Sequence, residues 1–265
     1  MSPTAAAAVA EVPATSAALP LRLLTLNLHK GFSTSGRRFV LHELRDAIRG
    51  ISADIVCLQE VLGEHRRHGA RQGARWPKVP QYEFLADSIW HQHAYGRNAV
   101  YDGGHHGNAV LSKLPIVRFQ NHDISIGGPE RRGILHCVLQ PQGRAEIHVL
   151  CTHLGLMEQH RQQQIDRLGA LIDNAVPADA PLLLAGDFND WRLRGHARLQ
   201  RELQLREVFV EAQGQCARTF PARWPLMRLD RIYYRHARVM CPSVLSARPW
   251  SHLSDHVALT TELEL

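Results

Sequence analysis

The chain has 265 residues, of which 45% are hydrophobic and 21% are charged, and this composition is typical of a globular protein with one substantial core. Its 31 Lys and Arg outnumber its 25 Asp and Glu, and the formal charge of +6 favours phosphate-bearing or polyanionic partners without identifying one. No segment offers the roughly 20 consecutive apolar residues that span a bilayer, so any membrane contact is expected to be peripheral.

The first twenty residues are rich in Ala and Pro, include Glu11 and lack a basic stretch. This composition predicts a disordered tail over residues 1–20 rather than a secretion signal, with one domain over residues 21–265. The five cysteines are odd in number and form no CxxC pair, and three of them lie in strand-like runs, as buried thiols do. These thiols favour a reducing, cytoplasmic location over a disulfide-linked exterior.

After Pro20, short β-like runs alternate with longer helical segments. The predicted strands are Leu21 to Leu28, Asp54 to Gln59, Gly107 to Ser112, Gly133 to Leu139, Ala145 to Leu154, Pro181 to Phe188, Arg228 to Tyr234 and His256 to Leu263. Apolar residues recur every three or four positions over Leu41 to Ile51 and Ile165 to Ala175, which predicts two amphipathic helices. Many strands, few helices and long loops together favour an α/β (α+β) fold in which sheets pack against each other with helices outside.

Polar side chains lie at or near the ends of several of these runs. They are Asn27, Glu60, His153, Asp187, Asn189, Asp230, Asp255 and His256. Strand ends can place side chains from distant parts of a sequence on one rigid edge. Carboxylates and amides without a thiolate suit Mg²⁺, with Mn²⁺ as the alternative. The residue types also suit attack of water on phosphorus, which needs a base for the water and positive charge for the phosphoryl oxygens.

Seven motifs then follow one another in an order that is specific as a set. They are TLNLHKG (Thr25 to Gly31), DIVCLQEV (Asp54 to Val61), HGNAVLSKLPI (His106 to Ile116), CTHLGL (Cys151 to Leu156), GDFND (Gly186 to Asp190), LDRIYY (Leu229 to Tyr234) and SDHVAL (Ser254 to Leu259). With these motifs the chain resembles the endonuclease/exonuclease/phosphatase (DNase I-like) superfamily over almost everything after Pro20. Within that superfamily it looks most like the bacterial YbhP-like group.

The resemblance implies a four-layer α/β sandwich, with two packed mixed β-sheets and helices on both outer faces. It implies a catalytic domain over residues 21–265, in which Glu60 is the principal ligand of Mg²⁺ or Mn²⁺. Asn27 and Asp255 would lie close to the same ion or its waters.

The resemblance also implies roles for the other matched positions. Asp187 and Asn189 would orient the attacking water and a phosphate oxygen, and His153 would hydrogen-bond the phosphoryl group. His256, held by Asp230, would contact the phosphate or act as general base. Whether Asp187 or His256 takes the proton stays open at this point, with Asp187 favoured as the residue that orients the water.

The function implied is that of a divalent-metal-dependent phosphoester hydrolase, foremost a phosphodiesterase acting on nucleic acid or on phospholipid. A phosphatase of small metabolites is an alternative, because fold and catalytic centre do not select the substrate. A non-catalytic binding scaffold is an alternative of another class. It predicts missing ligands, whereas every matched position retains the expected residue type.

Several further residues carry weaker expectations. Asn108 and Arg132 are candidate substrate-binding residues, against a structural Asn in a turn and a solvated charge. The basic run from Glu64 to Arg75 could face nucleic acid or phospholipid headgroups, although such runs are usually solvated loops. Trp76, Trp191 and Trp224 could stack on a base or touch lipid, but large aromatic residues more often pack inside, and this is the prediction for all three.

Overall fold

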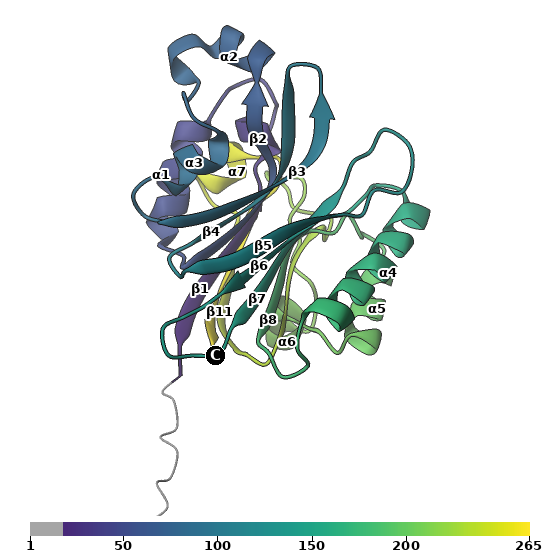
Figure 1. Cartoon of the computed structure of the whole chain (residues 1–265). Coiled ribbons are helices and arrows are strands. Elements are labelled where there is room, and N and C mark those ends of the chain that lie inside the picture. Colours follow the sequence, from purple (N-terminus) through teal and green to yellow (C-terminus); the bar gives the residue numbers. More distant parts are fainter. Residues whose placement is uncertain (1–17) are drawn as a thin grey trace, which may run out of the picture.

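The structure is a computed structural model that describes residues 18–265, and it contains two six-stranded β-sheets packed face to face (Figure 1). Most of the tail predicted over residues 1–20 therefore lies outside the described residues. The two ends of the described chain lie side by side, because the backbone of Leu19 exchanges two hydrogen bonds with that of Leu265. The two-sheet sandwich with helices outside confirms the predicted fold class.

The first sheet is mixed and has the order β11-β12-β1-β2-β4-β3. Its strands are β1 (Pro20–Asn27), β2 (Ile55–His65), β3 (Gln92–Tyr101), β4 (Gly104–Ser112), β11 (Arg238–Leu245) and β12 (Ala258–Glu264). β1 runs parallel to β2 and antiparallel to β12. Since β1 and β2 are parallel neighbours, their C-terminal ends lie side by side.

The second sheet is also mixed and has the order β5-β6-β7-β8-β10-β9. Its strands are β5 (Ile116–Asp123), β6 (Gly133–Leu139), β7 (Ile147–His153), β8 (Leu182–Asp187), β9 (Arg206–Glu207) and β10 (Asp230–Arg235). β7 runs parallel to β8, while β10 is antiparallel to β8. The C-terminal ends of β7 and β8 therefore meet the first residue of β10.

The helices lie mostly outside the two sheets (Figure 1). They are α1 (Leu41–Ile51), α2 (Arg66–Gln72), α3 (Gln81–Ala86), α4 (Glu158–Ala175), α5 (Arg194–Glu202), α6 (Val208–Gln213) and α7 (Trp250–Leu253), with short 3₁₀ turns η1 (His29–Gly31) and η2 (Gly73–Arg75). The predicted helices correspond to α1 and to the C-terminal part of α4. The basic run from Glu64 to Arg75 continues β2 into α2 and η2.

Three hydrophobic layers hold the sandwich together. The central layer joins the inner faces of the sheets, for example Leu23 and Cys57 with Val149. α1 inserts Leu44 against the outer face of the first sheet, and α4 inserts Leu168 against the outer face of the second. Burial of these apolar faces is the main driving force for the fold, and it fixes which strand ends meet.

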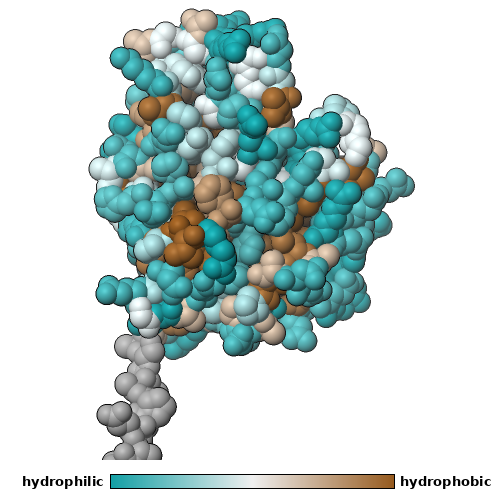
Figure 2. Space-filling view, viewed as in Figure 1, coloured by the Kyte–Doolittle hydropathy of each residue, from teal (hydrophilic) through white to brown (hydrophobic). Residues whose placement is uncertain are grey.

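The surface is mostly hydrophilic, as expected when the hydrophobic side chains lie in the three internal layers. On the face seen in Figure 2, hydrophilic side chains cover most of the molecule and hydrophobic ones gather in separate areas. None of the helices in residues 18–265 is long and apolar enough to cross a membrane. Four cysteines are buried and Cys241 is exposed, all as free thiols, which confirms the buried thiols predicted in the strand runs.

Candidate active site

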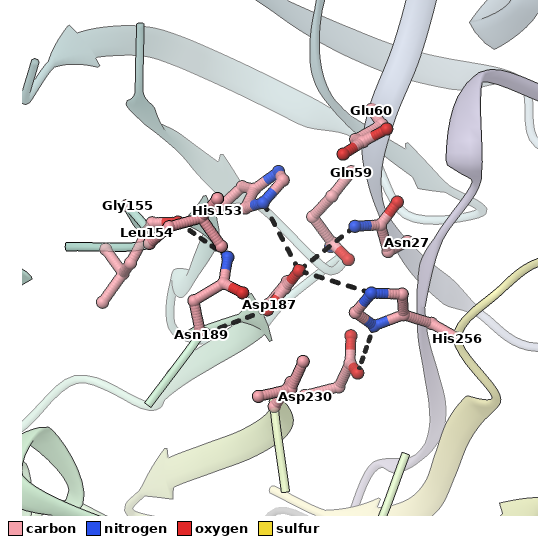
Figure 3. A network of polar contacts seen from close by, with 12 residues as sticks. Asn27, Gln59, Glu60, His153, Leu154, Gly155, Asp187, Asn189, Asp230 and His256 are labelled. Carbon is pink, nitrogen blue, oxygen red and sulfur yellow. Dashed lines mark hydrogen bonds and ion pairs between the residues drawn. The ribbon is translucent and has the colours of Figure 1, made fainter. Parts of the chain in front are cut away.

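Most of the predicted site residues lie together where strands of both sheets begin or end (Figure 3). They are Asn27, Glu60, His153, Asp187, Asn189, Asp230 and His256. β1 ends at Asn27 beside Gln59 of β2, and β7 ends at His153 beside Asp187 of β8. Asp230, the first residue of β10, is the register partner of Asp187. The sheet registers therefore bring together side chains that lie far apart in the sequence.

Asp187 is the centre of this gathering. Its Oδ2 accepts a hydrogen bond from Asn27 Nδ2 at 3.1 Å and lies 3.3 Å from His153 Nε2. Its Oδ1 accepts the backbone N–H of Asn189 at 3.0 Å, and Asn189 Nδ2 in turn donates to the carbonyl oxygen of Leu154. Asp187 is buried, so these contacts replace the water that its carboxylate has lost.

A glycine makes this approach possible. Gly186 has a φ of 148° and lies against the backbone of Thr152 on β7, where a side chain at position 186 would meet the Thr152 carbonyl oxygen. Only glycine fits such a close backbone approach. The glycine of the GDFND motif thus positions Asp187 next to His153.

His256 closes the network on its other side. Its Nδ1 lies 2.8 Å from Asp230 Oδ2, and its Nε2 lies 3.8 Å from Asp187 Oδ2. The other oxygen of Asp230, Oδ1, is buried without a hydrogen-bond partner. The structure thus shows the pairing of His256 with Asp230 that the resemblance implies. The buried set of Asn27, His153, Asp187, Asn189, Asp230 and His256 is called the polar floor below.

Within the polar floor, Asp187 and His256 are neighbours that carry opposite charges. Burial raises the pKa of Asp187 to about 6, although the nearby His256 acts to lower it. Burial acts to lower the pKa of His256, but Asp230 and Asp187 outweigh it and raise the pKa to about 10. Burial, with Arg132 and His256 nearby, holds the pKa of His153 well below its usual range. At neutral pH, Asp187 is therefore ionised, His256 is protonated and His153 is neutral.

Glu60 reaches the site through an irregularity in β2. The pairing of β2 with β4 shifts between Leu58 and Val61, and Glu60 sits in that shift with a φ of 54°. Lys30 Nζ lies 3.5 Å from Glu60 Oε2. Burial acts to raise the pKa of Glu60, but the electrostatic effect of Lys30, with smaller ones from His106, His29 and Arg132, lowers it overall. Glu60 is therefore ionised, in cationic surroundings.

A pocket of about 390 Å³ opens over these groups. It is lined by Asn27, Glu60, Arg132, His153, Leu156, Asp187, Asn189, Trp191, Phe220, Met227, Leu229 and His256. Seven of the ten predicted site residues line it directly, and Asp230 lies behind His256. Arg132 pairs with Glu130 at 2.8 Å and keeps a buried Nε without a hydrogen-bond partner.

Asp255 and Asn108 do not line this pocket. Asp255 lies 3.6 Å from His29 Nδ1 and accepts a hydrogen bond from Ser254. Asn108 is buried and donates its amide hydrogens to the carbonyl oxygens of Gly133 at 2.9 Å and Cys151 at 3.3 Å. Asn108 therefore ties the first sheet to the second from within β4, and not from the turn that the structural alternative expected.

Several residues in or beside the pocket were not identified from the sequence. Lys30 belongs to the TLNLHKG motif, where a basic residue just beyond a strand end was the available signal. Trp191 and Trp224 are 43% and 76% exposed, so the prediction that they pack inside is wrong, whereas Trp76 does stack on Phe39. A sequence pattern cannot tell an exposed loop aromatic from a buried one, because burial depends on the tertiary contacts of the loop.

The donor atoms fit a hard divalent cation in two places. Among residues 18–265, only Asp187, Asp230 and His256 bring three carboxylate or imidazole ligand atoms within 4.8 Å of one another. Here the two carboxylates already surround the protonated imidazole of His256, and a cation that bound at this place would have to displace its proton. Glu60 offers an ionised carboxylate to the pocket, beside an ammonium group that balances its charge. The oxygen donors and the absence of thiolates at both places suit Mg²⁺ or Mn²⁺.

The packed mixed sheets, the outer helices and the polar strand ends define a protein of the DNase I-like fold class. Residues 24–256 match the Endonuclease/Exonuclease/phosphatase family, and the chain belongs to that family. This match confirms the family that the seven motifs predicted. Members of the family are typically hydrolytic enzymes.

Among its relatives, the uncharacterized protein YbhP of Escherichia coli (strain K12) is 51% identical over 245 residues, which cover 92% of this chain and 96% of YbhP. A solved endonuclease/exonuclease/phosphatase from Beutenbergia cavernae aligns with a TM-score of 0.72 and 20% identity over 93% of this chain and 72% of that one. The human Nocturnin catalytic domain aligns with a TM-score of 0.68 and 18% identity over 92% of this chain and 93% of that one.

Proposed function

We propose that the chain is a divalent-metal-dependent phosphodiesterase in which water attacks phosphorus over the polar floor. The observation that carries this proposal is the convergence of four polar residues on the buried carboxylate of Asp187. They are Asn27, His153, Asn189 and His256. Membership of a family of hydrolytic enzymes supports it. The Nocturnin catalytic domain was solved with a bound sulfate anion, and sulfate is a tetrahedral oxyanion like phosphate.

The charge states favour Asp187 over His256 as the general base. A base needs a lone pair, and Asp187 is ionised above a pKa of about 6. His256 keeps its proton up to a pKa of about 10 and has no free lone pair at neutral pH. We therefore assign proton removal from water to Asp187, and to His256 the stabilisation of negative charge on the phosphoryl oxygens.

The phosphoryl group has further partners in the pocket. Arg132 is held in place by Glu130 and is able to pair with a phosphate oxygen. His153, neutral and fixed beside Asp187, supplies a hydrogen bond, and Asn189 orients the water together with Asp187. These groups sit on strand ends and buried turns, so little ordering is needed when substrate binds.

We propose Glu60 as the principal ligand of Mg²⁺ or Mn²⁺, with Asn27 and Asp255 near the ion. When bound, such an ion polarises the phosphoryl oxygens and lowers the pKa of coordinated water. Lys30 carries a positive charge and lies 3.5 Å from Glu60 Oε2, the side at which the ion would bind. Lys30 is therefore expected to move when the ion binds.

The proposed substrates are a nucleic acid or a phospholipid, with a small phosphorylated metabolite as the alternative. The test is Mg²⁺- and Mn²⁺-dependent hydrolysis of plasmid DNA, short RNA, phospholipids and phosphorylated small molecules, with EDTA and Asp187→Ala as controls. Turnover of one class that both controls abolish supports the proposal. Folded protein that hydrolyses none of them and binds neither metal would instead support the scaffold alternative.

A further inference from the structure

Exposed hydrophobic side chains lie on the loops that line the pocket. Eleven large hydrophobic residues are exposed within residues 18–265, and six of them lie on three loops that each contribute a lining residue to the pocket. The six are Leu156, Met157, Trp191, Trp224, Leu226 and Met227, and they are called the apolar rim below. Leu156, Trp191 and Met227 line the pocket itself. A cluster of exposed apolar residues around one opening is uncommon on a free monomer and indicates an interaction surface.

Two of the three loops are held from inside by one buried arginine. The side chain of Arg161 on α4 is fully buried and donates hydrogen bonds to the carbonyl oxygens of Gly155 at 3.0 Å and Leu156 at 2.7 Å. Its guanidinium carbon lies 4.8 Å from the centre of the Trp191 ring. Arg161 thus fixes Leu156 and Trp191 together in their exposed positions.

The third loop is a hairpin that the backbone holds rigidly. Thr219 and Leu226 donate their N–H groups to Met227 and Phe220, at 2.8 Å and 2.9 Å. Ala222 donates to the carbonyl oxygen of Asp255 at 2.7 Å, next to His256 of the polar floor. Trp224, 76% exposed, is therefore presented outward by a loop that is anchored to the site.

Exposed arginines flank the apolar rim. Arg223 precedes Trp224 in the hairpin, Arg218 lies at the base of that loop, and Arg192 and Arg194 follow Trp191. Arginine can place its stem along apolar surface while its charge stays at the level of polar headgroups. Tryptophan is enriched at the same level of a bilayer, and cationic side chains are attracted by anionic lipids.

This chemistry favours a lipid surface over a nucleic acid. Sites for single-stranded nucleic acid stack bases on aromatic rings. Four of the six residues in the apolar rim are Leu or Met, which offer no ring for stacking but suit insertion among acyl chains. Interfacial segments bury their apolar side chains about 5–10 Å into the headgroup and acyl boundary. Such insertion of the apolar rim brings the pocket mouth to the depth of the lipid phosphates.

We propose that the apolar rim docks the pocket onto an anionic lipid bilayer, and that the substrate is a phospholipid or another amphiphilic phosphoester taken from that surface. The choice of substrate rests on the proposed phosphoester hydrolysis, whereas the docking does not require catalysis.

The test is flotation of the full chain with vesicles of phosphatidylcholine, with or without phosphatidylglycerol. The wild-type chain is expected to bind the anionic vesicles, and the double variant Trp224→Ser with Leu226→Ser to bind them about tenfold more weakly or less. The matched control is Val117→Ser with Phe119→Ser on β5, where side chains 51% and 54% exposed lie outside the pocket. The control and Asp187→Asn are expected to bind vesicles as the wild type does.

The docking proposal is wrong if the wild type does not bind vesicles. It is also wrong if the double variant Trp224→Ser with Leu226→Ser, called the rim variant, binds them as well as the wild type does. Binding of a single-stranded oligonucleotide that the rim variant loses, with vesicle binding unchanged, would also overturn it in favour of nucleic acid. Hydrolysis of a water-soluble phosphodiester is measured separately. If the chain hydrolyses this substrate but does not bind vesicles, the docking proposal is wrong and the proposed function stands. If it binds vesicles but hydrolyses no phosphoester, the proposed function is wrong and the docking proposal stands.

Discussion

The polar floor of the pocket consists of ionisable and amide side chains that are buried, whereas its apolar rim consists of hydrophobic side chains that are exposed. Both invert the usual distribution of residues between interior and surface. In the floor, each charge has a partner within the network, as His256 has Asp230 and Asp187. In the rim, backbone hydrogen bonds and Arg161 hold the side chains outward. The difference separates two tasks, because the floor is arranged for chemistry and the rim for contact.

The largest expected effect comes from breaking the floor at its centre. Asp187→Asn keeps the size of the side chain but removes the base, so hydrolysis is expected to fall roughly 10²–10⁴-fold. The measurement is kcat/KM on any phosphoester that the wild type turns over, with Asp173→Asn, an exposed position on α4, as the control. A rate for Asp187→Asn within a few-fold of wild type would remove Asp187 from the mechanism.

Removing the carboxylate at the cationic side of the pocket is expected to have the next largest effect. Glu60→Gln should lower activity about 10²-fold and weaken metal binding, because the ion loses its charged ligand. Titration with Mn²⁺ followed by electron paramagnetic resonance reports the binding without relying on activity. Glu64→Gln, an exposed Glu on the same strand, should leave both readouts unchanged. Equal Mn²⁺ affinity in Glu60→Gln and wild type would place the ion elsewhere, with the group of Asp187, Asp230 and His256 as the next site to test.

The charge separation in the floor predicts a pH profile. Burial raises the pKa of Asp187 to about 6, so below that pH the base becomes protonated and kcat/KM is expected to fall about tenfold per pH unit. His256 keeps its proton up to a pKa of about 10, so activity should decline again only above that pH. A profile with its maximum well on the acid side of the Asp187 pKa would contradict this assignment of roles.

The smallest expected effect is on the rim and its internal support. Arg161→Gln removes the charge-assisted hydrogen bonds to the Gly155 and Leu156 carbonyl oxygens and the contact with Trp191, which should cost about 2–3 kcal/mol of unfolding free energy. Urea denaturation measures this cost, and Arg167→Gln, an exposed position on the same helix, should stay within about 0.5 kcal/mol of wild type. Vesicle binding should weaken a few-fold in Arg161→Gln. An unchanged stability would show that the rim loops do not depend on Arg161.

The sequence predicted the interior of the fold better than its edges. All eight predicted strands are present, and the four that were not predicted, β3, β5, β9 and β11, are the outer strands of the two sheets. β5 and β11 are mostly exposed or half-buried, and β9 has two residues, so none carries the long apolar run that reveals a buried strand. Interior strands can be predicted from their hydrophobic runs. Edge strands form because they pair with a neighbouring strand, and that neighbour is known only once the fold is known.

The same division applies to the site. Residues that end apolar strands, such as Asn27, His153 and Asp187, were predicted because the end of a buried run is visible in the sequence. Lys30 was missed because its contact with Glu60 depends on an irregularity in β2. Trp224 was predicted to pack inside and is exposed, because the hairpin that presents it is fixed by contacts to a segment about thirty residues away, at Asp255.

Hydrolysis in water labelled with a heavy oxygen isotope tests attack of water on phosphorus most directly. With Mg²⁺ or Mn²⁺ present, wild-type protein is expected to place the label in the product that carries the phosphate, and Asp187→Asn to form almost none of that product. Label recovered in the alcohol product would mean attack on carbon, and would contradict the mechanism assigned to the polar floor.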